Sequence, residues 1–178
     1  MHLSLLIILS ILLMIACWQD YREFRIKNKL VVTGAILGIA LNTFFATETG
    51  FLNALAGLGL GLLLLLPFYL LRIMGAGDVK LLAMVGAFVG QQAIFEVFLY
   101  TLIAGGFLAL FFSLWQGALR KMIDNVVLMC LLALSAKKSE ILGGNFSFAV
   151  EASASAGKLP YALAITTGTG VALALQYL

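Results

Sequence analysis

The chain has 178 residues, of which 63% are hydrophobic and only 11% are charged, and its formal net charge is +3. Soluble domains are roughly half apolar and about a quarter charged, so this composition excludes an ordinary soluble enzyme. A soluble fold of this size could not hide so many apolar side chains, and we therefore expect the lipid bilayer to be the solvent. The small positive charge does not indicate nucleic-acid binding.

Six apolar stretches follow one another along the chain, most of them near the length of a membrane-spanning helix, about 17–25 residues. They cover approximately residues 3–18, 30–45, 51–71, 78–89, 93–115 and 159–178. The fourth stretch is short for a span. The sequence thus predicts an all-α integral membrane protein, a bundle of six transmembrane helices that forms one domain over residues 1–178.

The basic residues are distributed unevenly over these spans. All 11 lysine and arginine residues fall on one side of a six-span arrangement, in or beside the loops at about 19–29, 72–78 and 116–158. Positively charged loops stay on the cytoplasmic side of a membrane. We therefore predict that these three loops are cytoplasmic and that the N- and C-termini are outside.

Glycine pairs at a spacing of four residues occur in three of the predicted helices. The pairs are Gly34 and Gly38, Gly57 and Gly61, and Gly86 and Gly90. Two small residues at this spacing lie on one helix face and let a neighbouring backbone approach closely. The pattern favours close helix packing, and a hinge is the alternative interpretation.

Two aspartates mark ends of spans on the predicted cytoplasmic side. Asp20 follows the first span, and Asp78 precedes the fourth within the stretch Gly75–Lys80, between two long apolar runs. An ionisable residue at membrane depth indicates a functional site. If the helix bundle brings the two carboxyl groups together, they share one proton. One carboxylate can then deprotonate water while the other, as a carboxylic acid, polarises a carbonyl.

Each of these residues also has a purely structural interpretation. Asp78 follows two glycines and precedes a helix, so it is a good candidate for an N-cap. Asp20 lies in a charged run and could be a solvated residue beside the membrane. Lys80 could orient a substrate acid or tune the pair, or it could extend its amine to the membrane surface as an anchor. With one histidine, His2, and no cysteine cluster, the sequence predicts no metal site.

At this point the chain resembles a known family. The segment Gly75–Lys80, which reads GAGDVK, matches the GxGD signature of the type IV prepilin peptidases. The segment Asp20–Asn28 resembles the second aspartate motif of that family, in which an Asp is followed by basic residues, here including Arg25, and then by Ile-Pro-Asn. The late segment Lys158–Ala162 is similar to the family's approach to its final helix.

The resemblance implies a membrane-embedded aspartic endopeptidase that needs no cofactor. Asp20 and Asp78 would cleave the basic leader of pilin-like prepilins at the cytoplasmic face of the bacterial inner membrane. The resemblance further implies substrate-binding or tuning roles for five residues: Gly75, Gly77, Lys80, Arg25 and Asn28. Gly75 and Gly77 would give an extended peptide room beside Asp78.

The chain departs from the family pattern in two places. Lys27 stands where the family usually has proline, and the N-terminal cytoplasmic domain with paired CxxC zinc motifs is not present in this sequence. The second departure resembles the short peptidases that serve Flp-type (tight-adherence) pili, and it leaves N-methyltransferase activity unsupported.

Other functions remain open at the level of sequence. A small proton-coupled carrier could use the same two carboxylates as a proton relay, although carboxylates at the ends of spans suit a carrier less well than carboxylates in mid-span. A presenilin-like GxGD intramembrane protease and a structural assembly factor are further alternatives.

Overall fold

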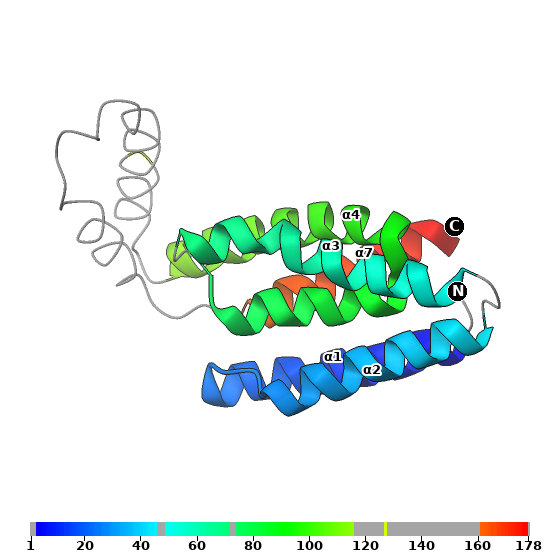
Figure 1. The fold of residues 1–178 in the computed structure, drawn as a ribbon. Coiled ribbons are helices and arrows are strands. Elements are labelled where there is room, and N and C mark those ends of the chain that lie inside the picture. The colour runs from blue at the N-terminus through cyan, green and yellow to red at the C-terminus, as the bar shows by residue number, and fades with distance from the viewer. Residues whose placement is uncertain (1–2, 46–48, 72–73, 116–126, 128–160, 178) are drawn as a thin grey trace, which may run out of the picture. The chain divides into compact units, whose positions relative to one another are not determined.

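The computed structural model describes residues 3–45, 49–71, 74–115, 127 and 161–177. All regular structure among these residues is helical (Figure 1). In chain order the helices are α1 (Leu3–Glu23), α2 (Asn28–Phe45), α3 (Gly50–Leu70), α4 (Ala76–Trp115) and α7 (Ala162–Tyr177). The predicted all-α class is confirmed for this part of the chain.

Four of these helices, α1 to α4, are long and apolar enough to cross a membrane. Helix α7 is also apolar but shorter, with 16 residues. Helices of this length and composition are typical of a multi-pass membrane protein. The predicted number of six spans and the outside location of both termini stay predictions.

The chain divides into two compact units, Met1–Gly106 with Leu159–Leu178, and Phe107–Lys158. Of the second unit, the structure describes only residues 107–115, which end α4, and residue 127. Apart from residue 127, the predicted cytoplasmic loop at 116–158 therefore lies outside the described residues. The first unit contains the candidate site, and its helices are described below.

Helix α4 consists of two helical halves that meet at Gly90. This residue has φ 82° and ψ 178°, which is not helical, and a positive φ is readily adopted only by glycine. Figure 1 shows that the chain reverses direction between the two halves. The break falls between the predicted fourth span, which ends at 89, and the predicted fifth, which begins at 93.

Two asparagines satisfy backbone groups that the break leaves unpaired. The side-chain amide of Asn42 in α2 donates to the carbonyl oxygens of Ala87 and Phe88, at 2.8 and 2.9 Å. On the other side of the break, the Oδ1 atom of Asn53 in α3 accepts the backbone N–H of Gln91 at 2.9 Å. Unpaired backbone groups are costly in an apolar environment, so these bonds make the reversal possible inside a helix bundle.

The first half of α4 is the central helix of the unit. Val79 and every residue of the segment Leu81–Phe88 are buried, whereas Lys80 is exposed. In α2, by contrast, only Val31, Gly34 and Gly38 are buried. A helix that is apolar on all sides belongs in the middle of a bundle, and this position brings the start of α4, with Asp78, among the ends of its neighbours.

Gly57, Gly61 and Gly86 lie where two helix backbones approach closely, as the packing interpretation predicts, whereas Gly90 lies at the break in α4. Gly57 of α3 faces Gly86 of α4, and a Cβ atom on either would overlap the backbone of the other helix. The same holds for Gly61 against the backbone of Leu82 and Ala83, whereas Gly59 of α3 has open space. Glycine is thus placed where two backbones touch, as close packing in membranes requires.

Candidate active site

Helix α1 extends past the end of its apolar stretch to Glu23 and carries Asp20 on its last turn. The Asp20 side chain is only 6% exposed. Its Oδ2 atom accepts the backbone N–H of Ala162, the first residue of α7, at 3.0 Å. The alternative interpretation of Asp20 as a solvated residue is therefore wrong, because the carboxylate lies in the contact between α1 and α7.

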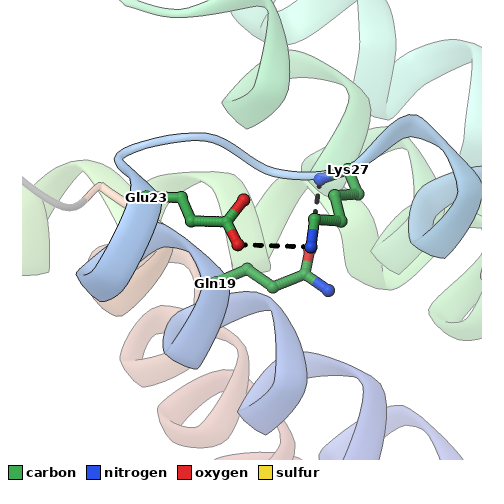
Figure 2. A network of polar contacts seen from close by, with 3 residues as sticks. All are labelled: Gln19, Glu23 and Lys27. Carbon is green, nitrogen blue, oxygen red and sulfur yellow. Dashed lines mark hydrogen bonds and ion pairs between the residues drawn. The ribbon is translucent and has the colours of Figure 1, made fainter.

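A tight turn follows Glu23, the last residue of α1, and leads into α2. The N–H of Phe24 donates to the Asp20 carbonyl at 2.9 Å, and the φ of 47° at Phe24 is left-handed, which ends the helix. Figure 2 shows the polar contacts that connect Lys27 in this turn to Gln19 and Glu23 of α1. The Lys27 N–H donates to Gln19 Oε1 at 3.1 Å, and Lys27 Nζ lies 3.2 Å from Glu23 Oε1.

This network gives Lys27 a structural role at the position where the family usually has proline. Proline has no N–H, so it could not make the bond to Gln19. The turn places Ile26, which is 6% exposed, against Gly77 of α4. A Cβ atom on Gly77 would lie 3.4 Å from the Ile26 Cβ, an ordinary contact distance. The turn between α1 and α2 therefore packs directly on the GxGD segment.

Asp78 is the third residue of α4 and not its N-cap. Its Oδ2 atom accepts the N–H of Gly75 at 3.3 Å, while its own N–H donates to the Gly75 carbonyl at 3.2 Å. An acid at the third helical position that reaches back to the N-cap amide forms half of a capping box. The side chain is half-buried, and no hydrogen bond to its Oδ1 atom is formed by the described residues.

The two aspartates come together at one end of the bundle. Asp78 lies close enough to Asp20 for their charges to repel each other. Tyr161, which directly precedes α7, lies close to Asp78 in turn. Burial and the Asp78 carboxylate raise the pKa of Tyr161 to about 12. Its hydroxyl therefore stays protonated at neutral pH and can donate a hydrogen bond.

Two of the remaining predicted site residues also meet. Lys80 Nζ donates to Asn28 Oδ1 at 2.9 Å, which joins α4 to the first residue of α2. Arg25 is exposed in the turn, and Gly75 is exposed at the start of α4. The structure thus pairs Asp20 with Asp78 and Asn28 with Lys80, and it brings Gly77 to Ile26.

The reasoning from sequence missed the contribution of Tyr161 and Ala162. The sequence of this segment resembles the family's approach to its final helix, and this resemblance implies no chemical role for either residue. A backbone N–H such as that of Ala162 carries no residue-type signal, whereas a tyrosine directly after Pro160 at the start of an apolar helix could have been noticed. Tyr161 packs on Gly105, where an added Cβ would lie 2.5 Å from its hydroxyl oxygen.

Within the described residues, no group of three or more His, Cys, Asp and Glu side chains could hold a metal ion. The features of the site are instead those of a carboxylate pair at one end of an apolar helix bundle. Fold and site together define an α-helical membrane protein with two acidic side chains within electrostatic range of each other.

Comparison with known protein families identifies the chain further. The model of the type IV leader peptidase family matches residues 7–114, well over half of the chain. The protein therefore belongs to this family, and it is a membrane peptidase of the prepilin-peptidase type. The match includes both aspartates and ends before α7. Searches of curated proteins and of solved structures give no significant match.

Proposed function

We propose that the protein is an aspartic endopeptidase that removes the basic leader from Flp-type prepilins at the cytoplasmic face of the bacterial inner membrane. The observation that carries the proposal is the approach of Asp20, from the end of α1, to Asp78, at the start of the central helix α4. Two carboxyl groups within mutual electrostatic range share one proton. One then activates water, and the other protonates or polarises the scissile carbonyl.

The glycines of the GxGD segment support a peptide substrate. Neither has a positive φ, and a Cβ on Gly75 or Gly77 would meet no described atom closer than 3.4 Å. The described part of the chain thus gives no reason for glycine at either position. We attribute both to a bound peptide, whose extended backbone needs to approach Asp78 closely. The choice of Flp-type prepilins rests on the resemblance described above.

The basic and amide groups beside the pair have a supporting role in this proposal. Lys80 and Asn28 hold each other at the edge of the site, where the ammonium group can orient an acidic side chain of the substrate. Arg25 is exposed on the adjoining turn and is available for the same purpose.

The test is leader cleavage of a co-expressed pilin-like substrate, followed as a gel shift. Wild type should cleave the leader, and Asp20→Asn and Asp78→Asn should both lose cleavage while still inserting in the membrane. Glu96→Gln is the matched control, since Glu96 is an exposed acid of α4 that contacts Gln176 near the end of α7. Cleavage by either aspartate variant would refute the catalytic pair. Proton flux in liposomes without any cleavage would favour the carrier.

A further inference from the structure

The two carboxylates of the pair have different hydrogen-bond partners. This difference bears on which of them acts as the general base and which as the general acid. Asp20 Oδ2 accepts the Ala162 N–H at 3.0 Å, in a contact where Asp20 is 6% exposed and Ala162 is fully buried. Asp78 Oδ2 accepts the Gly75 N–H at the longer distance of 3.3 Å, and Gly75 is exposed. An amide donor stabilises a carboxylate more than a carboxylic acid, and more strongly where water is excluded.

Helix dipoles act on both groups. Asp78 lies in the first turn of α4, where negative charge is favoured. Asp20 lies in the last turn of α1, where negative charge is disfavoured, but it accepts an amide from the first turn of α7, where negative charge is favoured. The observation that favours an ionised Asp20 is its shorter and buried hydrogen bond.

We propose that Asp20 is the ionised general base of the pair and Asp78 the protonated general acid, and that the Ala162 amide is the positioning group that sets this assignment. The inference rests on the proposed peptidase function and deepens it. In the reaction, Asp20 takes a proton from water as the water oxygen bonds to the scissile carbonyl carbon. Asp78 gives its proton to the carbonyl oxygen. Collapse of the tetrahedral species returns that proton to Asp78, and the Asp20 proton goes to the leaving amine.

Helix α7 is held in place for this role independently of Asp20. Cys17 Sγ in α1 and Thr166 Oγ1 in α7 lie 2.9 Å apart, and Thr166 also donates to the Ala162 carbonyl at 2.8 Å. These contacts lie one turn away from the Asp20 bond on the same two helices. The Ala162 amide is therefore fixed with respect to α1 by more than the bond that it makes to Asp20.

The assignment can be tested through the pH dependence of cleavage, because the acidic limb of kcat/KM reports the base and the alkaline limb reports the acid. Among described residues, the other titratable groups around the pair are Cys17 on α1, Tyr161 before α7, and Lys80 on α4, whose amine is directed to Asn28. In a Cys17→Ser background, neither limb of the pH profile can arise from titration of the thiol. The pKa of Tyr161, about 12, lies far above the range of the measurement.

The decisive variant is Ala162→Pro, which deletes the amide hydrogen at a first helical position, where proline is favoured. Without this donor, Asp20 takes up a proton at higher pH. We expect the acidic limb to move up by about one pH unit and the alkaline limb to stay in place. Ala162→Gly keeps the amide and should move neither limb. A shift of the alkaline limb in Ala162→Pro would make Asp20 the acid and overturn the assignment.

Gly75→Pro is the reciprocal variant and keeps the test decisive if Ala162→Pro does not fold. It deletes the amide that Asp78 accepts, so the proposal predicts an upward shift of the alkaline limb, smaller than that in the first variant because the bond is longer. Gly75→Ala retains the amide, so both limbs should stay in place even where the added Cβ slows cleavage by hindering the peptide. An acidic-limb shift in Gly75→Pro, or unmoved limbs in both proline variants, refutes the assignment. Failure of the peptidase function looks different, because wild type then does not cleave or an aspartate→asparagine variant still does.

Discussion

The contact between Gly105 and Tyr161 offers a sensitive test of the site, since it positions the tyrosine beside Asp78. A Cβ atom on Gly105 would lie 2.5 Å from the Tyr161 hydroxyl oxygen and 2.8 Å from ring atoms Cε2 and Cζ. Carbon atoms pack at about 3.5–4.0 Å, so the ring has to retreat by about 1 Å. Tyr161 lies close to Asp78, and the displacement of the ring therefore reaches this carboxylate.

We expect Gly105→Ala to lower kcat/KM for leader cleavage by about 10- to 100-fold, because a misplacement of about 1 Å in an active site has effects of this size. The variant should still insert and fold, since the end of a side chain moves and not a backbone. Gly106→Ala is the matched control on the same helix, as a Cβ there has no described atom within 4 Å. The assay is cleavage of a purified pilin-like substrate in detergent at equal amounts of folded enzyme. Equal rates for the two variants would refute the positioning role of Tyr161.

Three further predictions concern packing, the break in α4 and pH. Gly57→Ala should destabilise the fold by about 1–3 kcal/mol, because the new Cβ would lie 2.7 Å from the Gly90 carbonyl carbon. Gly59→Ala should not destabilise it, because a Cβ there has open space. Both are measured by unfolding in mixed micelles, and equal losses of stability would contradict the packing argument. Asn42→Leu should destabilise by about 1–3 kcal/mol, since two carbonyls lose their donor; an unchanged unfolding midpoint would show that these carbonyls find other partners. Tyr161→Phe should retain both limbs of the pH profile below about pH 10, because the pKa of Tyr161 is about 12 and the tyrosine is therefore the source of neither limb. Loss of a limb near neutral pH would contradict this.

The helices and their close contacts could be predicted from the sequence to a large extent. Long apolar stretches predict helices in a bilayer because an isolated strand or loop cannot satisfy its backbone there. Glycines at a spacing of four predicted where helices touch, and Gly57 and Gly86 do lie backbone to backbone. The short fourth stretch, by contrast, is the first half of a helix broken at Gly90. The asparagines that make this break possible come from α2 and α3, far away in the sequence.

The turn after α1 shows where a residue-by-residue comparison falls short. Lys27 replaces a proline of the family pattern, and from sequence alone this reads as a loss of stiffness. In the structure, the Lys27 N–H and ammonium group bond to Gln19 and Glu23 on the preceding helix. A proline and a lysine can thus restrain the same turn by different means, one through its ring and the other through two polar contacts.

The sequence by itself determined the class of protein and singled out both aspartates, because apolar length and a carboxylate beside membrane are local properties. Only the tertiary structure brought Asp20 and Asp78 within range of each other, since that depends on how α1 packs with α4 and α7. It alone also identified the Ala162 amide as the partner of Asp20, 142 positions further along the chain. The physical reason is that a hydrogen bond from the backbone depends on position and not on residue type.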